Sequence, residues 1–253
     1  RRLDESSPMV DARLPDGSRV NAIIPPLALD GPSISIRKFT RHHLGAQELI
    51  DSGSLTEARL DTMVKAVESR RNIIISGGTG TGKTTMLNLI SQYIPRQERI
   101  LTIEDSAELV LNHPHVVRLE TRPANTEGKG RISARELVIN ALRMRPDRII
   151  LGEVRSNEII ELLQAMNTGH DGSMSTIHAN STRDALVRIE TLLAVSGYEA
   201  SETAIGRLIG SALDIIIQLE RLPDGRRRVS EVVALTPTEN DLYHMDYLYR
   251  SQT

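Results

Sequence analysis

The chain has 253 residues, which exceeds one typical domain and suits one large domain or one domain with a smaller lobe. Hydrophobic residues make up 39% and charged residues 25%, and no apolar run reaches the roughly 20 residues of a membrane helix, so we expect a soluble globular protein. The net charge of −2 argues against a dominant basic surface for nucleic acid. Because the chain has no cysteine, disulfides, thiolate zinc sites and thiol catalysis are excluded.

The first forty residues predict a small lobe that contains β-strands. The chain begins with Arg1-Arg2, without a methionine or a signal peptide, so we expect it to be a piece of a longer protein. A turn signal at Pro15-Asp16-Gly17-Ser18 separates two strand-like runs, and a third run alternates after it. The predicted strands cover 10–14, 19–24 and 33–39.

The next segment is polar and broken by Gly45 and Gly53, which is typical of a linker and the edge of a helix. A helix over 56–69 follows, with its apolar residues on one stripe. We therefore divide the chain into the end of an N-terminal domain, a linker and a larger C-terminal domain, which cover 1–40, 41–55 and 56–253.

The sequence from 72 to 92, NIIISGGTGTGKTTMLNLISQ, predicts a strand, a glycine-rich loop and a helix. It matches G-x-x-x-x-G-K-S/T in the context that gives this motif its meaning. Glycines let backbone N–H groups converge on a phosphate, Lys83 would reach the β- and γ-phosphates, and the Thr84 hydroxyl would ligate Mg²⁺. We expect ATP to bind at Gly78, Thr79, Gly80, Thr81, Gly82, Lys83, Thr84 and Thr85.

Strands and helices alternate after this loop, which predicts a parallel sheet with helices on its faces. The sequence ends in two strands around the turn Pro223-Asp224-Gly225, which we expect to form a hairpin at the sheet edge. The predicted strands are 99–104, 116–121, 148–154, 173–178, 214–222 and 227–235, and the predicted helices are 134–144, 156–167, 182–196 and 201–213.

Two strands end in acids that suit nucleotide hydrolysis. RIILGEVR ends an apolar run with Gly152-Glu153, where P-loop enzymes place an acid that handles Mg²⁺ and the attacking water. Because Gly152 replaces the usual Asp, we expect Mg²⁺ to be held by Thr84, phosphates and waters, with Glu153 acting through water. LTIEDSAEL supplies Glu104 and Asp105, for which a helix cap or a surface pair is an equal alternative.

STIHANS places His178 at the end of a strand, behind a glycine-rich stretch. A single histidine on a strand is more often a packed, hydrogen-bonded residue than a sensor of ligand. The order of all four features changes this balance. GGTGTGKTT, LTIEDSAEL, RIILGEVR and GHDGSMSTIHA resemble, in order and spacing, the Walker A motif, Asp box, atypical Walker B motif and His box of the type II and type IV secretion ATPases.

This resemblance covers about residues 10 to 235, and Gly152 matches the family's own pattern. Within the family, LRMRPDRIILGEVR and RLPDGRRRVSEV look most like the tight-adherence (Tad) pilus assembly ATPases, with the VirB-type conjugation ATPases close behind. The resemblance implies an α/β fold with a RecA-like P-loop core and a smaller N-terminal α+β (PAS-like) domain that is only partly present. It also implies an ATPase that uses ATP and Mg²⁺ to power pilus assembly, retraction or secretion.

The resemblance implies a homo-hexamer in the cytoplasm, peripheral at the inner membrane, that works with membrane platform proteins. By motif match, Glu153 is the catalytic base or water-positioning acid, Glu104 helps near Mg²⁺ and water, and His178 senses the γ-phosphate. Arg19 and Arg37 match N-terminal arginines that reach the γ-phosphate. Composition alone would favour ordinary solvated arginines at these two positions.

Two other functional classes share parts of this pattern. A helicase or DNA translocase has the RecA-like core but would be expected to carry aromatic stacking residues, and aromatics make up only 2% of this chain. We therefore expect no direct nucleic-acid partner. A nucleotide-binding scaffold without turnover would have no need of Glu153 and His178.

Overall fold

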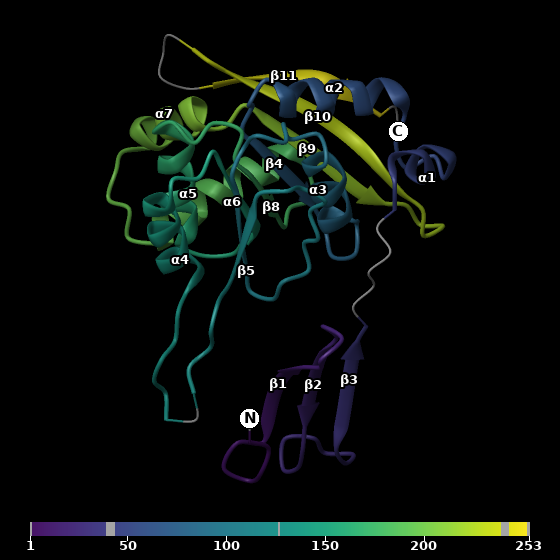
Figure 1. Cartoon of the computed structure of the whole chain (residues 1–253), viewed down its shortest axis with the longest axis vertical. Helices are drawn as coiled ribbons and strands as arrows, with labels where there is room; N and C mark the ends of the chain where they lie inside the picture. Colours follow the sequence, from purple (N-terminus) through teal and green to yellow (C-terminus); the bar gives the residue numbers. More distant parts are fainter. Residues whose placement is uncertain (1, 39–43, 126, 239–242, 252–253) are drawn as a thin grey trace. The chain divides into compact units, whose positions relative to one another are not determined.

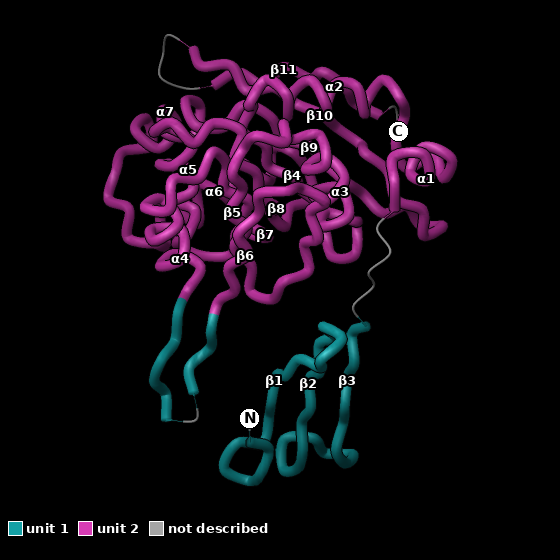
Figure 2. The backbone as a smooth tube through the Cα atoms, in the orientation of Figure 1, with its two compact units in different colours: residues 1–42, 122–132 teal, residues 43–121, 133–253 magenta. Residues whose placement is uncertain are grey.

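The computed structural model describes residues 2–38, 44–125, 127–238 and 243–251. The chain forms two compact units, one from residues 1–42 and 122–132 and one from residues 43–121 and 133–253 (Figure 2). Among the described residues, no helix combines the length and the apolar character needed to cross a membrane.

The smaller unit contains a three-stranded antiparallel sheet with the order β1-β2-β3. The strands β1 and β2 are joined by a tight turn, in which Asp16 Oδ1 accepts from Ser18 N at 2.9 Å and Gly17 has φ +94°. A positive φ favours glycine, so the turn signal in the sequence is confirmed. The bounds are β1 Met9–Arg13, β2 Arg19–Ile23 and β3 Ser33–Arg37, and the predicted extension to Phe39 lies outside the described residues.

The larger unit is built on an eight-stranded sheet with the order β11-β10-β9-β4-β8-β7-β5-β6. The six strands from β9 to β6 are parallel to one another, and β10 and β11 are added antiparallel at one side. The bounds are β4 Ile73–Gly77, β5 Ile100–Glu104, β6 Val116–Glu120, β7 Arg148–Val154, β8 Met174–Ile177, β9 Ile215–Arg221, β10 Arg227–Pro237 and β11 Tyr243–Arg250.

Helices cover both faces of this sheet and give a three-layer α/β arrangement (Figure 1). Strand residues alternate between two apolar cores, because successive side chains point to opposite faces. Ile74 packs into the core with α4 to α7, whereas Ile73 and Ile75 pack into the core with α1 to α3. The bounds are α1 Ala46–Asp51, α2 Glu57–Glu68, α3 Lys83–Ser91, α4 Ala134–Ala141 with a 3₁₀ turn at Leu142–Met144, α5 Glu158–Asn167, α6 Thr182–Val195 and α7 Glu202–Ala212.

The predicted α/β class and the alternation of strands and helices are confirmed, and two elements differ from the sequence prediction. The expected hairpin is present as β9 and β10, but its placement at the sheet edge is wrong, because β11 pairs outside β10 and is itself the edge strand. Residues 46–51, expected in a linker, form the helix α1, in which Leu49 is buried and Glu48 Oε2 accepts from Gly45 N at 2.7 Å. This helix has only six residues, too few to show a periodic apolar pattern.

Candidate nucleotide-binding site

The glycine-rich loop joins the carboxyl end of β4 to the start of α3. Gly80 and Gly82 have φ +73° and +96°, and a Cβ atom at Gly77 would lie 2.5 Å from Thr81 Oγ1. Within the described residues, no side chain caps α3 at Gly82, so the N–H groups of its first turn are available to a ligand. A helix start of this kind binds anions, and the loop therefore fits a phosphate group.

Lys83 lies against the loop that precedes it. Its Nζ donates to Gly77 O and Gly78 O at 2.9 Å each, and the residue is only 9% exposed. Burial lowers the pKa of Lys83, and the negative charge of Glu153 opposes that shift. The ammonium group is thus held over the loop carbonyls with an acid close enough to influence its charge.

Glu153 and His178 meet beside Lys83, and their roles as catalytic acid and γ-phosphate sensor stay predictions. His178 Nε2 lies 2.8 Å from Glu153 Oε1 and 3.4 Å from Lys83 Nζ. Burial lowers the pKa of His178, and the positive charge of Lys83 lowers it further. A neutral imidazole can donate from Nε2 to the carboxylate of Glu153. Because Lys83 Nζ is also a donor, it then affects His178 through its charge and not through a hydrogen bond to Nε2.

An irregularity in the sheet accompanies this group. The pairing of β7 with β8 shifts between Leu151 and Val154, and Thr176 Oγ1 donates to Gly152 O at 2.8 Å. Such bulges re-aim side chains next to functional sites. Glu153 lies within this bulge.

Arg155 is a member of the site that the sequence analysis did not single out. Its Nη2 lies 2.7 Å from Glu153 Oε2, and its Nη1 lies 3.1 Å from Asp105 Oδ2. Glu153 is therefore shared between a histidine and an arginine, and Asp105 joins the group through the same arginine. The signal was present in the sequence, because Arg155 follows Glu153 by two residues in RIILGEVR.

Glu104 ends β5, the strand next to β7, and it is neither a helix cap nor a surface residue. The residue is 5% exposed, and its Oε2 accepts from the N–H groups of Glu108 and Leu109 at 2.7 and 2.8 Å. Burial raises the pKa of Glu104, and the two N–H groups oppose that shift.

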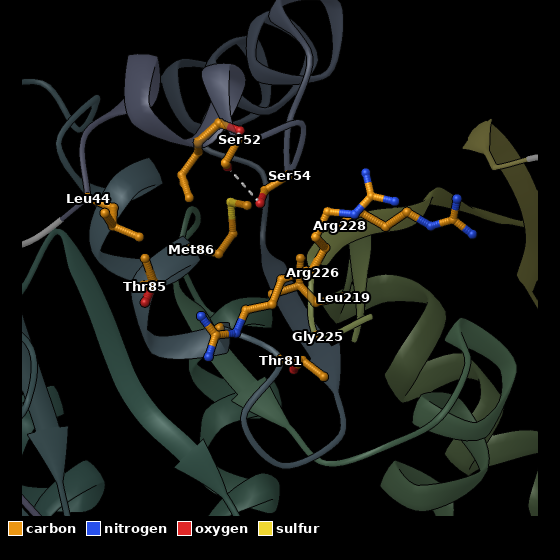
Figure 3. Close-up of a pocket in the computed structure, with 13 residues that line it drawn as sticks. Leu44, Ser52, Ser54, Thr81, Thr85, Met86, Leu219, Gly225, Arg226 and Arg228 are labelled. Carbon is orange, nitrogen blue, oxygen red and sulfur yellow. Dashed lines mark hydrogen bonds between the residues drawn. The ribbon is translucent and has the colours of Figure 1, made fainter. Parts of the chain in front are cut away.

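A cavity of about 240 Å³ adjoins the phosphate loop (Figure 3). Thr81, Gly82 and Thr85 belong to both the loop region and the cavity wall. The other wall comes from α1 and its flanks, from α3 and from the β9–β10 hairpin, through Leu44, Leu49, Ser52, Ser54, Met86, Leu219, Gly225, Arg226, Arg227 and Arg228. Both α1 and the hairpin arginines lie outside the motifs from which the site was predicted.

Arg227 connects the β9–β10 hairpin to the phosphate loop. Its Nε donates to Gly80 O at 2.8 Å, and its Cδ would lie 3.5 Å from a Cβ atom at Gly82. The two residues of this contact are 147 positions apart, so spacing within a motif could not indicate it.

The two remaining groups of predicted residues are placed as follows. Thr84 lies in the first turn of α3 and is half-buried. The described residues contain no cluster of three or more His, Cys, Asp or Glu side chains that could hold a metal by themselves. Arg19 and Arg37 face each other across β2 and β3 in the smaller unit, and their reach to a nucleotide stays a prediction.

A family model described as "Type II/IV secretion system protein" matches residues 1–231 of the chain. The chain belongs to this family. A Mycobacterium tuberculosis protein described as "Putative conjugal transfer protein" is 38% identical over 245 residues, which cover 94% of this chain and 69% of that protein. The type IV secretion system protein VirB11 of Bartonella quintana is 31% identical over 268 residues, with 92% and 75% covered.

A solved structure gives the same result for the fold. The VirB11 ATPase of the Brucella suis type IV secretion system, in complex with sulphate, matches with a TM-score of 0.62 and 27% identity. The match covers 92% of this chain and 76% of the other. The predictions of the type II/IV secretion family, of its ATPase fold and of an ATPase are confirmed.

Proposed function

We propose that the chain hydrolyses ATP at the phosphate loop and converts this reaction into mechanical work for a secretion or pilus machine. The observation that carries the proposal is the contact of Lys83, His178 and Glu153, which come from three different elements and meet at the carboxyl ends of the strands. In open α/β sheets this end is where ligands bind. A scaffold without turnover would not need an acid and a histidine there.

The loop and Lys83 bind and orient the phosphates in this proposal. Backbone N–H groups of the loop and of the first turn of α3 take the phosphate oxygens, and Lys83 neutralises their charge. Lys83 Nζ leaves its two carbonyl partners, Gly77 O and Gly78 O, to do so.

The residues fit a Mg²⁺ ion that is held mainly by the nucleotide. Thr84 would supply its hydroxyl, and Glu104 and Glu153 would approach the ion directly or through water. When bound, Mg²⁺ neutralises charge that develops on the transferred phosphoryl group.

Glu153 positions the attacking water and accepts its proton, and His178 reports on the γ-phosphate. The 2.8 Å contact between His178 and Glu153 lets a change at one side chain move the other. Because His178 also lies beside Lys83, phosphate binding at Lys83 would alter the electrostatic environment of the imidazole.

The cavity beside the loop would hold the nucleoside part of ATP. Its wall joins the loop residues Gly82 and Thr85 to the apolar side chains of Leu49 and Met86. Apolar walls with a few polar groups are typical of small-molecule sites. In this proposal α1 is an element of the nucleotide site rather than a linker.

The decisive test is Lys83→Ala with fluorescent ATP and with a phosphate-release assay. We expect ATP affinity to fall at least 100-fold and turnover to become undetectable, because the ammonium contacts phosphate in both ground and transition states. Lys65→Ala is the control, since Lys65 pairs with Asp61 on the exposed side of α2. Unchanged ATP affinity in Lys83→Ala would contradict the proposed site.

We propose further that the working form is a homo-hexamer in which Arg19 and Arg37 reach the γ-phosphate. Their cross-strand pairing puts both guanidinium groups on one row of the small sheet, and a guanidinium suits recognition of phosphate. Arg19→Ala and Arg37→Ala are expected to lower turnover far more than ADP affinity. An equal loss of both would make these arginines structural.

Assembly has its own test. If nucleotide favours the hexamer by linkage, light scattering will show a larger mass with ATP analogue and Mg²⁺ than without them. An unchanged mass over a wide concentration range would contradict nucleotide-linked assembly.

For the machine that is served, we propose the assembly of a Tad-type pilus at the cytoplasmic face of the inner membrane. The supporting observation is the likeness of LRMRPDRIILGEVR and RLPDGRRRVSEV to that subfamily. The relatives named as conjugal transfer and VirB11 proteins favour conjugation or type IV secretion as the alternative. Neighbouring genes for pilins and platform proteins would support the pilus, and genes of a conjugation system would contradict it. Stimulation of turnover by single-stranded DNA would instead favour a translocase.

A further inference from the structure

Gly152 lies on β7 at the position where a carboxylate residue would be expected. P-loop ATPases place an Asp on this strand to help hold Mg²⁺, and this chain has glycine directly before Glu153. The space that a side chain would need is already taken. A Cβ atom at Gly152 would lie 3.0 Å from Glu104 Cγ and 3.6 Å from Glu104 Cβ.

The side chain of Glu104, from β5, therefore lies against Gly152 of the neighbouring strand β7. It is fixed there, because Oε2 accepts from the N–H groups of Glu108 and Leu109. Its second oxygen, Oε1, is buried and has no hydrogen-bond partner within the described residues. A buried carboxylate oxygen without a partner is costly, so it calls for a ligand or a function.

We propose that Gly152 is a positioning residue: its missing side chain leaves the room in which Glu104, from β5, holds the carboxylate that the proposed function places near Mg²⁺. The inference rests on the proposed ATP hydrolysis. Two observations carry it independently: the close approach of Gly152 to Glu104, and the buried Oε1 atom. Because Gly152 has no side chain, the carboxylate of Glu104 can reach this position from the neighbouring strand β5.

The geometry explains why a methyl group at Gly152 would matter. A contact of 3.0 Å is closer than ordinary carbon–carbon packing, so Glu104 or β7 would have to shift. Glu104 resists this shift through its two N–H bonds, and β7 is held at this point by the bond from Thr176 Oγ1 to Gly152 O. The shift would move the carboxylate of Glu104 or the bulge that carries Glu153.

The first experiment is Gly152→Ala in the full chain. We expect kcat to fall at least tenfold, while the Kd for ADP without Mg²⁺ stays within threefold. We also expect the Mg²⁺ concentration that half-saturates binding of a non-hydrolysable ATP analogue to rise several-fold. In a Glu104→Ala background the same substitution is expected to change neither quantity further, because its neighbour is gone. A Gly152→Ala chain with wild-type kcat and Mg²⁺ dependence would overturn the proposal.

The second experiment moves the carboxylate from one strand to the other. The double variant Glu104→Ala/Gly152→Asp is expected to turn over at least ten times faster than Glu104→Ala. Its Mg²⁺ dependence is expected to return part of the way to that of the wild type. Glu104→Ala/Gly152→Asn is the matched control, with the same shape and no charge. Equal behaviour of the Asp and Asn variants would overturn the proposal.

Folding and turnover are kept apart by two further measurements. Thermal unfolding shows whether the double variants fold. If they do not fold, the proposal is tested by combining Gly152→Ala with Glu104→Ala, and fully additive effects on kcat would overturn it. A wild-type chain that hydrolyses no ATP would contradict the proposed function itself. A wild-type chain that hydrolyses ATP, with Gly152→Ala unchanged, would contradict only the inference about Glu104.

Discussion

Charged and polar side chains gather at both ends of the parallel strands, and the two groups differ in burial and in pairing. At the amino ends, Arg148 is fully buried, and its Nη2 donates to Glu98 Oε1 at 3.2 Å. Asn72 is also buried there, and its side chain donates to Ala212 O at 2.7 Å and accepts from Gly172 N at 2.8 Å.

At the carboxyl ends burial is mixed, because Lys83 is buried whereas His178 is partly exposed, and the groups share their partners. Glu153 is contacted by both His178 and Arg155, and His178 lies beside both Glu153 and Lys83. The side chain of His178 is 39% exposed.

The difference separates stability from function. A buried charge whose partner is lost destabilises a fold strongly, so the amino-end pairs are expected to lock the strands. Groups with competing partners can exchange one partner for a ligand, so the carboxyl-end groups are expected to respond to nucleotide. Substitutions at the amino end are therefore expected to lower stability more than turnover, and substitutions at the carboxyl end are expected to lower turnover more than stability.

The largest effect is expected for Glu153→Gln at the carboxyl end. Gln keeps the size of the side chain but removes the base, so kcat is expected to fall about 10³-fold. The melting temperature and the Kd for ADP are expected to stay near wild type. Glu120→Gln is the control, because Glu120 ends β6 at the same edge of the sheet. Turnover near the wild-type rate in Glu153→Gln would remove the catalytic role of this acid.

The next effect is expected for Arg148→Met at the amino end. It leaves the carboxylate of Glu98 without its buried partner and with only the longer, more exposed pair to Arg70 Nη1 at 3.6 Å, so the free energy of unfolding is expected to fall by about 3 kcal/mol in a urea titration. The kcat of the folded fraction is expected to stay within twofold of wild type.

Two variants test whether burial causes this effect. Arg71→Met removes the more exposed ion pair with Asp214 at the same end, and it is expected to cost less than about 1 kcal/mol. Adding Glu98→Gln to Arg148→Met is expected to restore part of the loss. Similar losses for Arg71→Met and Arg148→Met would show that burial is not the cause.

The carboxyl end was predictable from the sequence because its residues come from local motifs. The run 72–92 carries its own strand, loop and helix signals, and the strand ends at Glu104, Glu153 and His178 follow from apolar periodicity. Parallel strands then bring these ends to one edge of the sheet.

The amino end and the hairpin contacts were not predictable in the same way. Arg148 and Glu98 are 50 positions apart, and no local pattern shows that an arginine at a strand start will be fully buried. The close approach of Glu104 to Gly152 depends on which strands are neighbours. Such contacts are set by sheet order, which sequence periodicity does not specify.

The smallest effect is expected for Arg227→Ala. Arg227 contacts the phosphate loop from the β9–β10 hairpin, outside the motifs from which the site was predicted. Its Nε bond to Gly80 O holds the loop at a glycine with φ +73°. An exposed hydrogen bond contributes about 1 kcal/mol, so loss of the bond from Arg227 to Gly80 O is expected to weaken ADP binding about fivefold. Arg226→Ala is the matched control, since Arg226 pairs with Asp224 within the hairpin turn. Arg227→Lys is expected to recover part of the affinity, because an ammonium can also donate to the carbonyl. Isothermal titration with ADP measures all three variants. If Arg226→Ala and Arg227→Ala weaken ADP equally, the hairpin acts through its charge on the nearby cavity and not through the contact with Gly80.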